Sequence, residues 1–171
     1  FSIFSLIENT GVGLEDLLEE RYPYFEEWAE EIARVEARYR VKKRLINCMD
    51  FDDLLVLTLQ LLQKNEELRS LYQKRFQYVL VDEFQDTNYV QSELVDLLVG
   101  EDQSLMVVGD DAQSIYSWRG ADMDNILSFP ERYPKAQVYR IEKNYRSVPE
   151  ILELSNSAIK ANRQRFEKDL Q

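Results

Sequence analysis

The sequence predicts an α/β fold in which a parallel sheet is flanked by helices. Two short apolar runs support this prediction, at 78–81 and 105–108, and each stops abruptly at acidic residues. A third and weaker run lies at 138–141, and we expect a further strand there. Apolar residues between the first two runs recur at helical spacing instead. Short buried strands that alternate with helices are typical of a parallel sheet and not of a β-sandwich.

Helices are predicted before the first strand. Apolar residues from Leu14 to Tyr39 recur in steps of three and four, which is the spacing of one buried helix face. Pro23 is expected to divide this stretch into two helices, because its ring fits a first helical turn and not an interior. We expect the aromatic residues of the stretch to lie in the core. A strongly apolar helix is predicted at 51–62, and Asn65 is the expected cap of the next helix.

Two helices are predicted after the first strand. Asn88 begins a helical pattern that continues to Leu98 and is closed by Gly100. The segment 147–150 begins with Ser and ends with Glu, which is the spacing of a capping box. This spacing predicts the start of a last helix.

Composition limits the classes of function. The 171 residues include 44% hydrophobic and 12% aromatic residues, which is enough material for a core. The sequence has no run of about 18 apolar residues, the length needed to span a bilayer. Its single cysteine, Cys48, fits a reducing compartment. We therefore expect a cytoplasmic protein without a membrane partner. The net charge of −11 weighs against a simple electrostatic DNA binder. Because the sequence begins at Phe1, we expect a piece of a longer protein.

Acidic residues directly follow the first predicted strand. Ligands of parallel sheets lie beyond the carboxyl ends of the strands, where Asp82 and Glu83 are expected. One or two carboxylates with waters and phosphates are typical of a Mg²⁺ site, and a neighbouring carboxylate can orient or deprotonate an attacking water. The alternative is that two acids simply end a strand at the surface. The two residues alone do not decide between these interpretations.

The second predicted strand also ends in acids, Asp110 and Asp111, and two aromatic residues follow. Tyr116 and Trp118 lie in a segment rich in polar side chains, and aromatic rings that face a groove can stack on nucleic-acid bases. Core packing is the alternative, and without further context it is the favoured one.

Four segments together resemble the superfamily 1 DNA helicases of the UvrD/Rep/PcrA type. VDEFQDTN at 81–88 is similar to helicase motif II, and VVGDDAQSIYSWRGA at 107–121 to motif III. NYRS at 144–147 is similar to motif IV, and DFDDLL at 50–55 to a further family signature. The segments occur in the order that the family has.

The resemblance implies a role for each polar residue of the ATP site. Asp82 would hold Mg²⁺, and Glu83 would activate the water that attacks the γ-phosphate of ATP. Gln113 would sense the γ-phosphate and couple it to DNA. Arg146 would reach the γ-phosphate from a second motor lobe, as an arginine finger does.

The resemblance also implies the partners and the domain organisation. Tyr116 and Trp118 would stack on bases of single-stranded DNA, and partners would include junctions of single- and double-stranded DNA. The implied fold is part of a RecA-like sheet of the P-loop NTPase class. Residues 1–48 would belong to a helical accessory subdomain, 49–135 to the first motor lobe and 136–171 to the second. The implied activity is 3′-to-5′ translocation or unwinding in DNA repair or replication.

One element of the family is missing from this sequence. A phosphate-binding loop has the form G-x-x-x-x-G-K-[ST], and none of the five glycines here is followed by Lys and Ser or Thr. We therefore expect the isolated chain to hydrolyse ATP negligibly, and we expect self-association through an exposed sheet edge and face. The alternatives are a non-catalytic module that binds single-stranded DNA or a protein, and the motor subunit of a helicase–nuclease complex.

Overall fold

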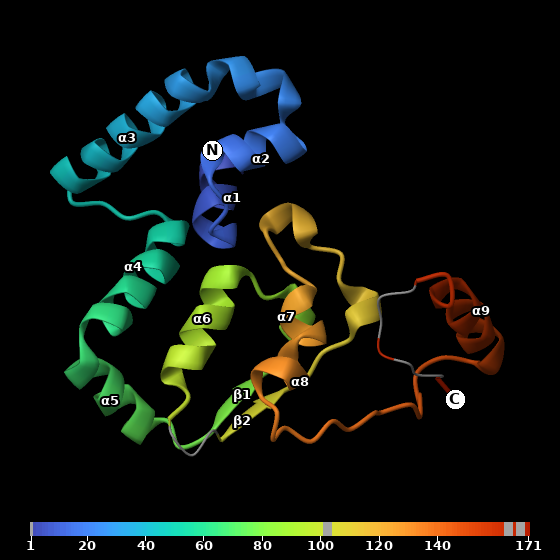
Figure 1. Cartoon of the computed structure of the whole chain (residues 1–171). Helices are drawn as coiled ribbons and strands as arrows, with labels where there is room; N and C mark the ends of the chain where they lie inside the picture. Colours follow the sequence, from blue (N-terminus) through green and yellow to red (C-terminus); the bar gives the residue numbers. More distant parts are fainter. Residues whose placement is uncertain (1, 101–103, 163–165, 167–169) are drawn as a thin grey trace.

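The computed structural model describes residues 2–100, 104–162, 166 and 170–171. Eleven helices and strands, separated by short 3₁₀ turns, follow one another along this part of the chain: α1 (Ser2–Thr10), α2 (Leu14–Arg21), α3 (Ala29–Leu45), α4 (Phe51–Lys64), α5 (Glu66–Arg75), β1 (Val79–Val81), α6 (Tyr89–Leu98), β2 (Leu105–Val107), α7 (Asp124–Leu127), α8 (Phe129–Arg132) and α9 (Pro149–Ile159). Helices α1, α4 and α6 lie close together, and the two strands run below α6 and α7 in Figure 1.

The two strands form a parallel pair, as the sequence predicts. Leu80 of β1 is in register with Met106 of β2. Hydrogen bonds continue beyond the strands, because the amide of Val108 donates to the carbonyl of Val81 over 2.8 Å. The amide of Phe84 then donates to the carbonyl of Val108 over 2.9 Å. The α/β class is therefore confirmed, and the two chain segments that follow the strands leave the sheet side by side.

The predicted strand at 138–141 is wrong. This segment forms no strand, and the side chains of Val138, Tyr139 and Ile141 are exposed. A strand needs a neighbour for its backbone hydrogen bonds, and β1 and β2 pair only with each other in the part of the chain that the structure describes. The residues at 138–141 therefore have the composition of a strand, but no neighbouring strand is present to pair with them among the described residues.

The helices before β1 follow the predicted boundaries but not the predicted burial. A 3₁₀ turn begins at Pro23 and separates α2 from α3, which confirms the break. Leu17 and Leu18 of α2 are almost completely buried. Phe25 and Trp28, however, are 48% and 53% exposed, so the prediction that they lie in the core is wrong. Periodicity shows that a helix has an apolar face, but it does not show what covers that face.

Helix caps explain where several of the helices begin. The side chain of Asn65 accepts a hydrogen bond from the amide of Leu68, which confirms the predicted cap. The side chain of Asn88 accepts from the amide of Gln91, and the helix that was predicted to begin there is α6. The predicted capping box at 147–150 is wrong, because Val148 is the N-cap of α9 and makes no side-chain cap bond. No described helix is both long enough and apolar enough to cross a membrane.

Candidate functional site

The first acidic pair lies directly after β1, at the carboxyl end of the strand. Asp82 and Glu83 are both exposed, and Asp82 Oδ1 accepts a hydrogen bond from the amide of Glu83 over 2.9 Å. Glu83 has a φ of 50°, in the left-handed region. A non-glycine residue in this conformation is uncommon and costs about 1–2 kcal/mol, and such conformations cluster at functional sites. The conformation of Glu83 is therefore an additional indication that this position belongs to a functional site.

The segment after β2 forms a compact turn around Asp110. One carboxylate oxygen of Asp110 accepts from the amide of Ala112 over 3.0 Å, and the other accepts from Nε2 of Gln113 over 2.8 Å. The side chain of Gln113 is exposed in this arrangement. Asp111 is buried, and its Oδ2 accepts from the amide of Phe166 over 3.2 Å. Two residues predicted from sequence, Glu83 and Gln113, thus lie on the two segments that leave adjacent strand ends.

Gln85 joins these two segments, and our sequence analysis assigned it no role. Its side chain is 1% exposed. The amide nitrogen donates to Glu83 Oε2 over 2.8 Å, and the amide oxygen accepts from the amide of Asp110 over 2.9 Å. Glutamine is usually exposed in proteins, so nothing in the residue type indicates this buried position. The available signal was its place inside the segment similar to motif II.

The aromatic residues lie on an exposed loop beside α1 and α2. The side chain of Trp118 is 62% exposed and that of Tyr116 is 39% exposed. Core packing, which the sequence alone favoured, is therefore wrong for both rings. Arg21, the last residue of α2, donates to the carbonyl of Ser117 over 3.3 Å, between the two rings in sequence. Gly120 has a φ of 85° and lies so close to α1 that an added Cβ would be 3.2 Å from Thr10 Cγ2.

Arg146 is not brought to the acidic residues. It lies in the loop before α9, its side chain is exposed, and none of the ion pairs between described residues includes it. The loop itself is ordered by Asn144, whose Oδ1 accepts from the amides of Arg146 and Ser147 over 2.8 and 2.9 Å.

The acidic residues fit a hard divalent cation. Asp82 and Glu83 offer carboxylate oxygen, and Asp86 nearby in sequence has a buried Oδ1 without a hydrogen-bond partner. The described residues hold no cluster of three or more His, Cys, Asp or Glu side chains that could bind a metal by themselves. Mg²⁺ keeps several waters and is typically held by one or two carboxylates together with phosphates of a substrate. The donor set therefore fits Mg²⁺ bound with a nucleotide.

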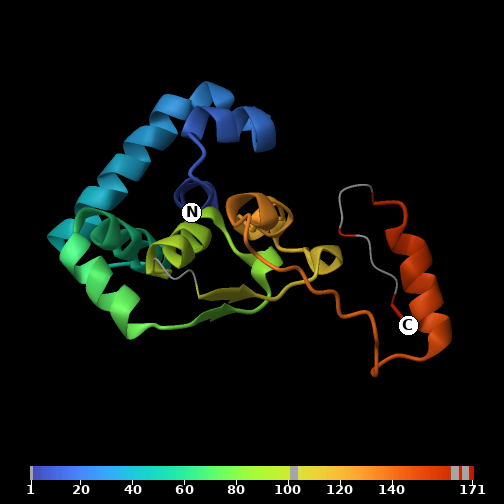
Figure 2. The same ribbon diagram turned by 60° about the horizontal axis from the view of Figure 1, so that its bottom comes forward.

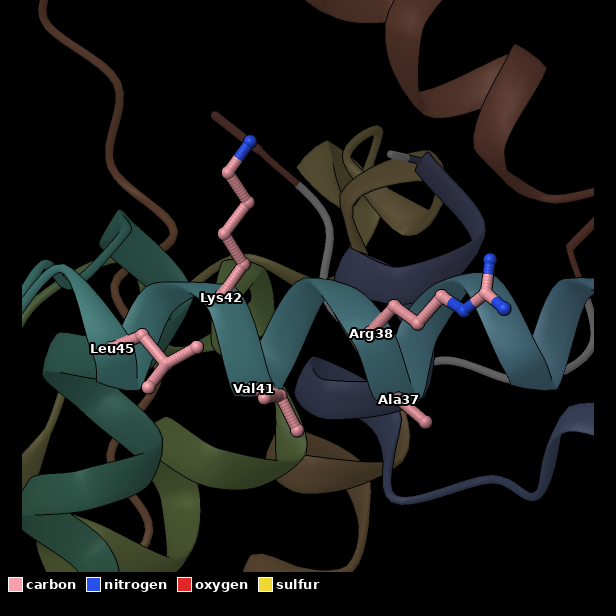
Figure 3. Close-up of a pocket in the computed structure, with 5 residues that line it drawn as sticks. All are labelled: Ala37, Arg38, Val41, Lys42 and Leu45. Carbon is pink, nitrogen blue, oxygen red and sulfur yellow. The ribbon is translucent and has the colours of Figure 1, made fainter.

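A shallow hollow lies elsewhere, on α3, and is not part of this site. Figure 3 shows its lining side chains: Ala37, Arg38, Val41, Lys42 and Leu45. None of them carries a carboxylate, so the hollow has no group that could hold Mg²⁺ or accept a proton from an attacking water.

Comparison with known proteins decides the family. The family model of the UvrD/REP helicase N-terminal domain matches residues 3–134. The chain belongs to the UvrD/REP helicase family. The match covers β1, β2 and both segments that follow them, so Glu83, Gln85 and Gln113 all lie inside the family domain.

Curated members of the UvrD/REP family are closely similar in sequence. ATP-dependent DNA helicase PcrA of Bacillus subtilis is 48% identical over 139 residues, which is 81% of this chain and 19% of that protein. ATP-dependent DNA helicase Rep of Salmonella typhimurium is 48% identical over 132 residues, 77% of this chain and 20% of that protein. PcrA of Leuconostoc citreum is 44% identical over 141 residues, 82% of this chain and 19% of that protein. The chain thus spans about a fifth of the length of these relatives.

Proposed function

We propose that this chain is part of the motor of an ATP-dependent DNA helicase, which couples hydrolysis of Mg²⁺-ATP to movement along single-stranded DNA. The observation that supports this most directly is the position of Glu83 and Gln113. They lie on segments that leave the carboxyl ends of adjacent parallel strands and are joined through Gln85. Ligands of parallel sheets bind at such ends.

Each residue of the ATP site has a distinct chemical task in this proposal. Asp82 holds Mg²⁺, which when bound offsets the charge of the ATP phosphates. Glu83 orients the attacking water and accepts its proton, and its exposed position leaves the carboxylate accessible to that water. Gln113 contacts the γ-phosphate through its side-chain amide. Arg146 completes the site as an arginine finger, which requires the loop before α9 to approach the strand ends.

The exposed rings of Tyr116 and Trp118 bind single-stranded DNA by stacking on its bases. Stacking is tolerant of sequence because every base has a π-face, which suits a motor that moves along any strand. The net charge of −11 is compatible with this mode, because the contact depends on aromatic rings more than on a basic face. The proposed direction is 3′-to-5′, the proposed substrates include junctions of single- and double-stranded DNA, and the proposed context is DNA repair or replication.

The proposed domain organisation places three units along the chain. Residues 1–48 form part of a helical accessory subdomain, 49–135 part of a first RecA-like motor lobe and 136–171 the start of a second lobe. Two observations support the boundary after residue 135: the family match ends at residue 134, and α9 lies apart from the other helices in both views (Figures 1 and 2).

The sequence contains no phosphate-binding loop, so we propose that the isolated chain hydrolyses ATP negligibly. We also propose that it self-associates through one face of the sheet. Leu80 and Met106 are register partners and are 71% and 57% exposed, which leaves an apolar surface on that face.

Turnover of Mg²⁺-ATP, with and without single-stranded DNA, tests the motor function. The chain is compared with the full-length protein that contains it, and with that protein carrying Glu83→Gln. We expect DNA-stimulated turnover in the full-length protein alone, and loss of that turnover in the variant. Absence of turnover in the full-length protein would favour the alternative, a non-catalytic module that binds single-stranded DNA through Tyr116 and Trp118.

A further inference from the structure

Gln85 makes hydrogen bonds at both ends of its side chain, and these bonds connect the two segments of the candidate site. Its amide nitrogen is 2.8 Å from Glu83 Oε2, and its amide oxygen is 2.9 Å from the amide nitrogen of Asp110. The backbone carbonyl of Gln85 also accepts from the hydroxyl of Ser114 over 3.4 Å. With the side chain 1% exposed, water does not compete for these bonds.

The surrounding structure is built around this side chain. Gly109 lies directly against it, because an added Cβ there would be 2.6 Å from Gln85 Oε1. The same Cβ would be 2.6 Å from Cδ1 of Ile126 in α7. Any larger residue at position 109 would displace Gln85 or α7. Glycine is thus required here by close packing against the amide and not by backbone conformation.

The hydrogen bonds form a continuous path from Glu83 to Gln113. Gln85 connects the Glu83 carboxylate to the backbone of Asp110, and the Asp110 carboxylate accepts from Gln113 Nε2 over 2.8 Å. Gln113 is followed within five residues by Tyr116 and Trp118. Three hydrogen bonds therefore lie between the loop that carries the aromatic rings and the Glu83 carboxylate.

We propose that Gln85 is a positioning residue, which holds the Glu83 carboxylate in place and links it to the segment that carries Gln113 and the aromatic rings. Binding of single-stranded DNA then changes the orientation of Glu83 through Gln85. This inference rests on the proposed function, because it assigns Glu83 to hydrolysis and the rings to DNA. Gln85 itself touches neither ATP nor DNA.

The test is Gln85→Met in the full-length protein. Methionine has a similar length but neither an amide donor nor an amide oxygen. We expect kcat for ATP with single-stranded DNA to fall about 10- to 100-fold, because a misplaced general base loses much of its contribution. KM for ATP and Kd for DNA in the absence of nucleotide should each change less than about twofold. A KM or Kd effect as large as the kcat effect would overturn the positioning role.

A binding measurement without turnover provides a second readout. A non-hydrolysable ATP analogue should change the Kd for single-stranded DNA in the unaltered protein, and linkage makes this coupling reciprocal. In Gln85→Met, the Kd for single-stranded DNA measured with the analogue should be close to the Kd measured without it, so that their ratio is near one. An unchanged ratio would show that the coupling does not pass through Gln85.

Two controls separate this role from a loss of folding. Gln73→Met removes two amide hydrogen bonds from a part-buried glutamine, to the carbonyls of Leu97 and Val99, and should leave kcat unchanged. If Gln85→Met does not fold, Gly109→Ala with Ile126→Val displaces Gln85 while removing the atom of Ile126 that would clash. The double variant should show the same kcat loss, and Ile126→Val alone should not. Normal kcat in the double variant would overturn the proposal.

Failure of this inference is distinguishable from failure of the proposed function. If Glu83→Gln leaves turnover intact, the assignment of Glu83 is wrong and the proposed function fails. If Glu83→Gln abolishes turnover and Gln85→Met does not lower kcat, only the role of Gln85 is overturned. Adding Gln85→Met to Glu83→Gln should cause no further loss, because Gln85 acts through Glu83.

Discussion

Asn88 donates a hydrogen bond from its side-chain amide to Oδ1 of Asn9, 79 residues earlier in the chain, over 2.9 Å. Both side chains are buried. Asn9 in turn donates to Oδ1 of Asp52 over 2.7 Å. This chain of polar side chains joins α1, α4 and the start of α6. It therefore connects the proposed accessory subdomain to the segment that begins with Asp82 and Glu83.

The first prediction concerns the stability of this junction. Asn88 both caps α6 and satisfies the buried oxygen of Asn9. Asn88→Ala should lower the free energy of unfolding by about 2–4 kcal/mol, because it removes a helix cap and leaves a buried polar group unpaired. Urea denaturation followed by circular dichroism measures this loss.

A matched variant separates the two contributions. Asn65 caps α5 in the same way, through the amide of Leu68, but it is exposed, and its side chain makes no hydrogen bond to a distant residue within the described part of the chain. Asn65→Ala should cost only about 1 kcal/mol. Equal losses for the two variants would show that the hydrogen bond to Asn9 contributes nothing.

The strands and caps could be predicted from the sequence because their signals are local. Apolar runs of four residues located β1 and β2, and the polar residues Asn65 and Asn88 located the helix starts. The burial of the Gln85 side chain could not be predicted, because it depends on packing near Gly109 and Ile126, which are distant in sequence. Exposure of Phe25 and Trp28 was missed for the same reason, since a periodic pattern does not identify the surface that would cover it.

The second prediction concerns the dependence of stability on pH. Burial disfavours the charged form of Asp50, but hydrogen bonds from Lys43, the Asp53 amide and Tyr39 outweigh it and lower the pKa of Asp50 from 3.8 to about 2. A lowered pKa in the folded state stabilises the fold above the unfolded pKa, and this contribution disappears as the pH falls through about 2.

Asp50→Asn tests this contribution. The remaining amide oxygen can still cap α4, while the charge and the acceptor for Lys43 and Tyr39 are lost together. At pH 7 the variant should be less stable by about 1–2 kcal/mol, after allowance for the partial exposure of the side chain. The difference between the two proteins should shrink between about pH 5 and pH 2. A difference that stays constant over this range in urea titrations would contradict the assignment.

The third prediction concerns DNA binding. Trp118→Ala and Tyr116→Ala should each weaken the affinity of the full-length protein for single-stranded DNA by about 1–3 kcal/mol, the range for stacking of one base on an aromatic ring. Fluorescence anisotropy with a labelled oligonucleotide measures the change. Ile115 lies in the same loop and is 69% exposed, so Ile115→Ala controls for loss of apolar surface. An equal effect of Ile115→Ala would remove the argument for stacking.

The last prediction concerns self-association of the 171-residue chain. Leu80 and Met106 lie on the same face of the sheet, because they are register partners in a parallel pair, and both remain exposed. Tyr78 and Val108, at the ends of the strands, add to the exposed apolar surface near this face. A contiguous apolar surface on a soluble chain favours association, and a charge at its centre opposes it. Leu80→Lys should therefore raise the concentration at which oligomers appear in sedimentation velocity by about tenfold, equivalent to about 1.4 kcal/mol.

Leu154 of α9 provides the matched control. It is 72% exposed, almost the same as the 71% of Leu80, and Leu154→Lys adds the same charge outside the sheet. If both variants reduce association equally, net charge and not the sheet face controls it.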